Sequence, residues 1–153
     1  MMRKRTGPMV IFSAFAMTLA SVGTAYAQPA ASPPANAAAP LRLELNRLEP
    51  DGQNCRVYLL ADNSKGEAYR SFKVDLFVLD TDGVAAKRVV LELGPIAAGK
   101  TLIRLFDIPA VPCARFGRML LNDVLACEAE AGARQNCLAD TRTDSKASVP
   151  FAK

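Results

Sequence analysis

Four cysteines carry the chemistry of this chain that is easiest to define. They could form two disulfides, a Cys₄ metal site or a reactive thiol. Their spacings contain no CxxC and the sequence has no histidine, so a thioredoxin-like redox pair, a compact zinc knuckle and the histidine-based catalytic triads are not indicated. We therefore expect two structural disulfides, for which three connectivities are possible. The residues are Cys55, Cys113, Cys127 and Cys137.

Two acidic stretches are the other candidates for a site. The stretch Asp80-Thr81-Asp82-Gly83 has the D-x-D-G core of a calcium loop but lacks the later bidentate glutamate, so it favours a hairpin turn. Asn122 and Asp123 interrupt the apolar run 119–126, and alternation would turn one of them inward, where a polar group needs partners. We expect a bulge or an edge position there, with a binding site as the alternative.

Cofactor chemistry has no recognisable motif. The nine glycines are isolated from one another, so there is no glycine-rich phosphate loop. A general acid and base pair built on Asp123 would need a second carboxyl group in a pocket that the sequence does not indicate. We therefore predict no catalytic residue, no metal ligand and no cofactor.

The first 27 residues have the three-part layout of a secretory signal peptide. A basic start (3–5) precedes an apolar run (9–22) and a small-residue exit, Ala25-Tyr26-Ala27. We predict cleavage after Ala27 and a periplasmic or secreted protein. A helix that spans a membrane needs about 20 apolar residues, and this run is shorter, so no stable membrane anchor is expected after cleavage. An oxidising compartment also favours disulfides.

Net charge argues against a nucleic-acid partner. The signal holds three basic residues and no acidic one, so its removal lowers the formal net charge from +4 to +1 for residues 28–153. A charge of that size produces no long-range field that would gather a polyanion. An envelope protein remains a possible partner, and the oligomeric state is left open.

The rest of the chain divides into a spacer and one domain. Residues 28–40 are rich in alanine and proline, without charged or aromatic side chains, and we predict a disordered spacer. From residue 41 to 153, apolar residues alternate in short segments separated by turns, which predicts one β-sandwich domain with two antiparallel sheets. After Cys127 we expect a loop to about Lys146 and a seventh strand near 148–151. The six earlier strands are expected at Leu41–Asn46, Cys55–Asp62, Phe72–Val78, Val84–Leu93, Thr101–Ile108 and Arg118–Cys127.

Two family resemblances accompany this pattern. The stretch Phe72–Gly83, followed by Ile96–Thr101, resembles bacterial immunoglobulin-like modules of the FxLYD type, although Val78-Leu79-Asp80 lacks the tyrosine of that name. Residues 41–153, including Leu120–Cys127 and Val149-Pro150-Phe151, are similar to small exported proteobacterial proteins labelled only by a signal sequence. The resemblance implies an immunoglobulin-like fold of six to seven strands and an exported location, and it implies no activity.

An immunoglobulin-like topology makes the cysteine pairing predictable. In it, the second and sixth strands run parallel in opposite sheets. Cys55 begins the second strand at the end of the sandwich where Cys113 enters the sixth, and Cys127 leaves the sixth strand near the loop that holds Cys137. We therefore predict the pairs Cys55–Cys113 and Cys127–Cys137.

These observations favour a binding function. We expect an exported, non-enzymatic module that binds another cell-envelope protein or a small ligand through a sheet edge or a loop end. Asn122 and Asp123 are its candidate binding residues. The alternative is a carboxylate-dependent hydrolase that acts on an envelope polymer and is centred on Asp123.

Overall fold

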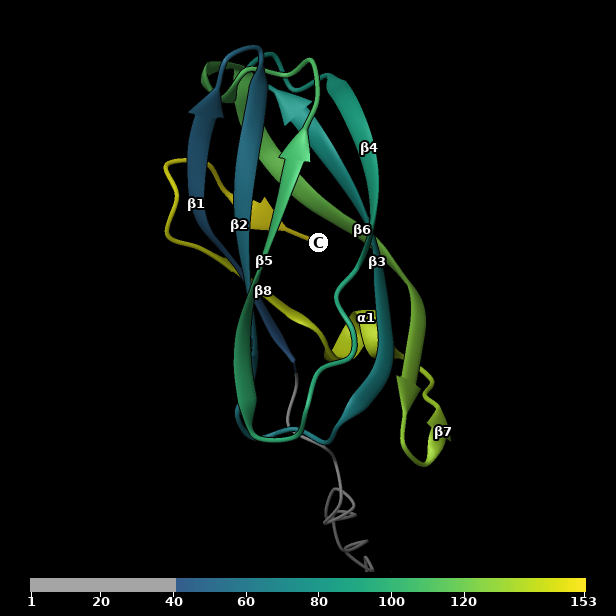
Figure 1. Ribbon diagram of the computed structural model, residues 1–153. Helices are drawn as coiled ribbons and strands as arrows, with labels where there is room; N and C mark the ends of the chain where they lie inside the picture. Colours follow the sequence, from purple (N-terminus) through teal and green to yellow (C-terminus); the bar gives the residue numbers. More distant parts are fainter. Residues whose placement is uncertain (1–40) are drawn as a thin grey trace, which may run out of the picture. The chain divides into compact units, whose positions relative to one another are not determined.

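The structure, a computed structural model, describes residues 41–153. The predicted signal peptide (1–27) and spacer (28–40) lie outside the described residues. Two β-sheets face each other and enclose the core (Figure 1). The predicted two-sheet β-sandwich is therefore confirmed.

The first sheet has the strand order β5-β2-β1-β8. The second has the order β4-β3-β6-β7, and β9 also pairs with β6. The strands of the first sheet are β1 (Arg42–Asp51), β2 (Asn54–Asn63), β5 (Lys100–Ile108) and β8 (Arg142–Ser145). Those of the second are β3 (Tyr69–Asp80), β4 (Ala85–Glu92), β6 (Phe116–Ala129), β7 (Gly132–Ala133) and β9 (Phe151–Ala152). Two short helices, η1 (Cys113–Arg115) and α1 (Cys137–Asp140), flank β6 in the chain.

The core follows from the alternation of apolar side chains. Every second residue of β2 is buried between the sheets, and β3 contributes a matching row. Each fully buried aliphatic or phenyl side chain contributes about 1.5–3 kcal/mol relative to an exposed one. The largest of these fully buried apolar residues are Phe72, Leu43, Leu45, Leu59, Leu76, Leu93, Ile96, Ile108, Met119 and Leu121.

Both predicted disulfides are present. Cys55 and Cys113, with Cα atoms 4.8 Å apart, join the start of β2 to η1. Cys127 and Cys137, with Cα atoms 6.4 Å apart, join the end of β6 to α1. Two disulfides fit a protein of an oxidising, extracytoplasmic compartment. Cleavage after Ala27 stays a prediction.

The tail differs from the sequence-based expectation. The predicted loop from 128 to about 146 contains β7, α1 and β8, so that prediction was wrong. Backbone bonds hold β8 in place: Arg142 N–H donates to Leu41 O (2.8 Å) and Lys146 N–H to Leu45 O (2.9 Å). Apolar alternation, the signal that identified the other strands, is absent from β8. Residues 41–153 thus form nine strands rather than six to seven. Of these, β8 pairs in parallel with β1, and β9 pairs in parallel with β6.

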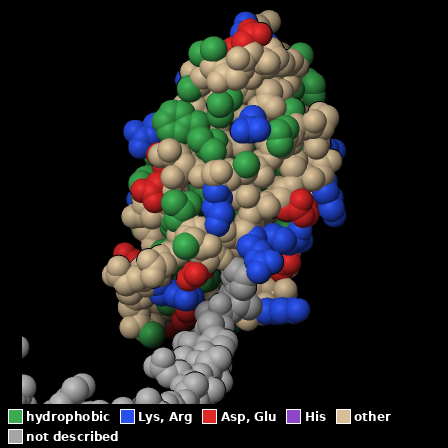
Figure 2. Space-filling model, turned by 180° about the vertical axis from the view of Figure 1, so that it is seen from behind, with side chains coloured by type: hydrophobic (Ala, Val, Ile, Leu, Met, Phe, Trp, Pro, Cys, Tyr) green, Lys and Arg blue, Asp and Glu red, His purple; other side chains and the backbone are tan. Residues whose placement is uncertain are grey.

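The described part of the chain has a mixed surface. Lysine, arginine, aspartate and glutamate side chains are interspersed on the face shown in Figure 2. No single sign of charge dominates there, as the small net charge of residues 28–153 led us to expect. Between residues 41 and 153, no helix is long and apolar enough to span a bilayer.

Candidate functional site

Among the described residues, one edge of β6 is paired only at its two ends. The other edge pairs with β3 along the strand. On the free side, Met119 and Leu120 pair with β9, and Glu128 and Ala129 pair with β7. Between them, Leu121–Ala126 has no strand partner on that side among residues 41–153. We call this stretch the open edge.

The open edge is also irregular. Its register with β3 shifts twice, which leaves Asn122 and Leu125 without a partner on β3. Such bulges bend a strand and increase its twist, and they are common at sheet edges and beside functional sites. The expectation of a bulge or an edge position at Asn122 and Asp123 is confirmed, because both features occur there.

Asn122 serves the structure of the sheet. Its Nδ2 donates to Asp75 Oδ2 (2.8 Å) on the neighbouring strand. Arg88 on β4 donates to the same carboxylate through Nε (2.7 Å) and Nη2 (3.2 Å). These bonds, that from Arg88 above all, lower the pKa of Asp75 although burial opposes them. Asn122 therefore fixes the bulge to β3, and its role as a binding residue stays a prediction.

The backbone of Val124 faces the open edge. Phe72 O accepts a hydrogen bond from Leu93 N–H (2.8 Å), so Phe72 directs its backbone groups toward β4. Because alternate residues use opposite edges of a strand, Asp75 directs its groups toward β6 and its register partner Asp123. Val124 follows Asp123 and therefore directs its N–H and C=O away from β3.

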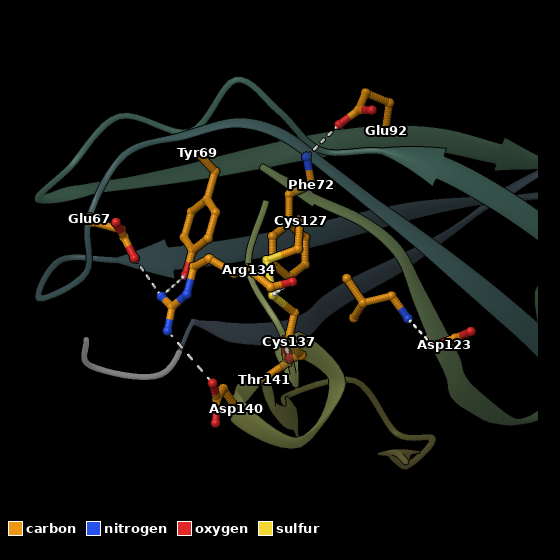
Figure 3. The surroundings of a disulfide bond; sticks show 11 residues. Glu67, Tyr69, Phe72, Glu92, Asp123, Cys127, Arg134, Cys137, Asp140 and Thr141 are labelled. Carbon is orange, nitrogen blue, oxygen red and sulfur yellow. Dashed lines mark hydrogen bonds and ion pairs between the residues drawn. A yellow bond between two sulfur atoms is a disulfide. The ribbon is translucent and has the colours of Figure 1, made fainter. Parts of the chain in front are cut away.

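The side chain of Asp123 accepts a hydrogen bond from the backbone N–H that faces the open edge. Its Oδ1 accepts a hydrogen bond from Val124 N–H at 2.8 Å, and Figure 3 shows this bond beside the disulfide. The Asp123 side chain is exposed. A strand that paired with Val124 would first have to take this N–H from the carboxylate.

A groove of about 380 Å³ runs along the open edge. One wall is Asp123–Glu128 of β6, and the other is the segment Ala133–Leu138, which we call the outer wall. The Cys127–Cys137 disulfide joins the two walls. The surface of the groove is mixed, with apolar side chains from Leu125 and Leu138 beside carboxylates and amides.

Arg134 fixes the outer wall to the sandwich. Its Nη1 donates to Glu67 Oε1 (2.6 Å) and Tyr69 Oη (3.1 Å), its Nη2 lies 3.7 Å from Asp140 Oδ2, and its N–H donates to Cys127 O (2.9 Å). Burial raises the pKa of Tyr69, and the charge of Arg134 partly offsets that shift. Figure 3 shows the guanidinium turned toward these partners, away from Asp123. No pattern in the sequence indicates this cluster, because Arg134 lies in the segment that was predicted as a loop.

The groove carries uncompensated negative charge. Asp123 and Glu128 both line it, and both are exposed. Neither forms an ion pair within the described residues. Arg134, the basic residue among those lining the groove, is bound to carboxylates on its other side.

The D-x-D-G stretch closes a hairpin. The carboxylate of Asp80 accepts hydrogen bonds from the N–H groups of Asp82 (3.0 Å) and Val84 (2.9 Å) and from Arg115 Nη2 (3.0 Å). The bond from Val84 is the main reason that the pKa of Asp80 is lowered. The predicted hairpin turn is thus confirmed, with the first aspartate of the motif used to hold it.

A hydrolase centred on Asp123 would need a second carboxyl group that acts as a general acid. Asp75 lies opposite Asp123 in the register of the two strands. A general acid needs a raised pKa, whereas the pKa of Asp75 is lowered by Arg88. Asp75 is therefore a poor general acid, and the hydrolase alternative stays a prediction.

Comparison with known proteins yields similarity of fold. No family model and no curated protein matches the chain, so the resemblances to FxLYD-type modules and to the signal-sequence group stay predictions. The structure is similar to that of IrmA from Escherichia coli, with a TM-score of 0.50 and 14% sequence identity. The similarity covers 67% of this chain and 89% of the other. At that identity the likeness supports a shared fold alone.

Proposed function

We propose that this protein is a non-enzymatic binding module of the cell envelope that receives an extended segment of another envelope protein along the open edge of β6. The observation that carries the proposal is the unpaired middle of a long strand that opens on a groove. An unpaired strand edge offers backbone donors and acceptors to a second strand, and side-chain pockets beside it add specificity.

Two features of the groove favour an extended segment over a compact ligand. The strand supplies the backbone N–H and C=O of Val124, which suit main-chain pairing. The groove also follows β6 from Asp123 to Glu128, so its length is that of a few residues in extended conformation. A small ligand is the other occupant that we expected from the sequence, and it would leave this backbone pairing unused.

Site-specific photo-crosslinking in living cells tests the proposal. A photoreactive residue in place of Leu125, which is 47% exposed, reports on the open edge. The matched control replaces Ile103, which is 46% exposed on the edge strand β5. We expect Leu125 to give one dominant adduct that maps to an extended segment of an envelope protein. The same adducts from Ile103, or none from Leu125, would contradict the proposal.

A further inference from the structure

We propose that the segment bound at the open edge carries a lysine or arginine that pairs with Asp123, so that Asp123 closes the edge in the free protein and selects the partner on binding. This inference rests on the proposed function and names the chemistry of its partner. It is carried by the hydrogen bond from Val124 N–H to Asp123 and by the charge of the groove.

Binding requires an exchange of hydrogen bonds. In the free protein, Val124 N–H donates to Asp123 Oδ1 at 2.8 Å. A paired strand would place its own carbonyl oxygen on Val124 N–H, which releases the carboxylate. The partner would then cover the released group and remove water from it. A buried charge without a partner is costly, so the incoming segment needs a group that pairs with it.

The charge of the groove sets the sign of that group. Glu128 lies in the same wall as Asp123, and neither forms an ion pair within residues 41–153. The guanidinium of Arg134 is bound to Glu67 and lies near Asp140. A cation on the partner is therefore attracted to the groove, whereas an acidic side chain meets repulsion from two carboxylates. Leu125 and Leu138 offer apolar contact to the residues beside the cation.

A set of three peptides tests the inference. Blocked peptides of sequence Thr-Val-Xaa-Val-Thr, with lysine, glutamine or glutamate at Xaa, are titrated into the protein at millimolar concentration. Binding is followed by the NMR shift of the Val124 backbone amide. We expect the lysine peptide to bind roughly tenfold more tightly than the glutamate peptide, with glutamine between them, and the difference to shrink as salt is added.

Variants identify the carboxylate responsible. Asp123→Asn keeps an oxygen that can accept from Val124 N–H but removes the charge, so the preference for lysine over glutamine should disappear. Glu128→Gln should reduce the preference by less. The matched control is Asp107→Asn on β5, where the carboxylate pairs with Arg56, and it should leave the preference unchanged.

The possible failures are distinguishable. Equal binding of the three peptides, or tightest binding of the glutamate peptide, would overturn the basic partner and leave strand addition standing. A preference that survives Asp123→Asn would overturn the role of Asp123. If none of the peptides shifts the Val124 amide, strand addition at the open edge fails, and this inference fails with it.

Discussion

Two unpaired strand edges of this protein, that of β5 and the open edge of β6, are built differently. β5 keeps a regular antiparallel register with β2 along its whole length, whereas β6 is bulged at the open edge. Each edge exposes an apolar residue to a similar degree, Ile103 at 46% and Leu125 at 47%. The difference lies in how each edge is protected against pairing with another chain.

The edge of β5 is protected by an inward charge. Arg104 alternates with exposed neighbours, points between the sheets, and donates from Nε to Leu93 O (3.2 Å). Inward charged residues on edge strands prevent a second chain from pairing there, because pairing would remove water from the charge. This protection is part of the packing of the edge, because Arg104 is partly buried and bonded to the Leu93 carbonyl.

The open edge of β6 is protected by a side chain that can move away. Val124 at this edge turns a partly buried apolar side chain inward. Its N–H is bonded to the exposed carboxylate of Asp123, which rotation about the side-chain bonds can withdraw. A short, irregular edge with removable protection suits regulated binding, whereas a long, regular edge needs permanent protection to prevent aggregation.

Loss of either disulfide should lower the stability of the protein most, but loss of only one of them should abolish binding. In the chain-entropy model, loss of Cys55–Cys113 lowers the free energy of unfolding by roughly 4 kcal/mol and loss of Cys127–Cys137 by roughly 3 kcal/mol, because they close loops of different length. Only the second disulfide joins the walls of the groove. We therefore expect paired alanine substitutions at Cys127 and Cys137 to abolish partner binding.

Denaturant melts of both double variants, with partner capture at a temperature where each is folded, check this prediction. The Cys55 and Cys113 double variant serves as the control, because it is the less stable protein yet should still bind. Loss of binding in both variants would mean that the groove depends on overall stability and not on its outer wall.

A smaller effect is expected from the carboxylate that holds the bulge. Asp75→Asn weakens the hydrogen bonds from Asn122 and Arg88. We expect the free energy of unfolding to fall by about 1–2 kcal/mol at neutral pH, a small value because solvent screens the exposed Arg88. The pKa of Asp75 is lowered on folding, so its contribution is full above the ordinary carboxyl pKa of about 4 and is lost as the pH falls below it. Urea melts at pH 7 and pH 3 should thus show that acidification lowers the free energy of unfolding by less in the variant than in the wild type. An equal loss would contradict this.

A proline at each edge tests the comparison directly. Val124→Pro removes the backbone donor of the open edge, and we expect partner affinity to fall at least tenfold. On β1, the carbonyls of Leu41 and Leu45 point to β8. Because alternate residues use opposite edges of a strand, Leu60 on β2 directs its backbone groups to β1. Ile103 lies opposite Leu60 and therefore directs its N–H and C=O to the free edge of β5. Ile103→Pro is therefore the matched control. It should bind the partner normally, and affinity can be measured by calorimetry.

The smallest effect is expected from removing the protection of β5. Arg104→Val leaves an apolar residue where the inward charge was, and we expect weak self-association that rises with protein concentration. Partner binding at the open edge should not change. Sedimentation at several concentrations checks this, with Arg56→Val, which changes an outward arginine on β2, as the control. A variant that stays monomeric throughout would show that Arg104 is not what protects β5.

The sandwich and its disulfides could be predicted because they depend on local patterns. Apolar alternation marks strands with one buried face, and an immunoglobulin-like topology brings Cys55 to Cys113. The tail could not be predicted, because β8 is held by backbone bonds to β1 and has no apolar period. The burial of Glu44 also could not be predicted. It lies on the polar side of β1 yet is fully buried, and a hydrogen bond from Asn46 lowers its pKa.

The candidate site was predictable only in part. The polar interruption at Asn122 and Asp123 indicated a bulge or an edge. The open edge itself depends on where β7 and β9 stop pairing, and strands of two residues have no period to detect. The outer wall depends on Arg134 reaching Glu67 and Tyr69, a contact between distant parts of the chain.

Amide hydrogen exchange with and without the captured partner shows which of the two strand edges binds it. Val124 and Ile103 both direct an amide to an unpaired edge, so the two positions report on the two edges in one experiment. We predict that the partner slows exchange at Val124 and leaves Ile103 unchanged. Slower exchange at Ile103 with Val124 unchanged would place the binding surface on β5 and contradict binding at the open edge of β6.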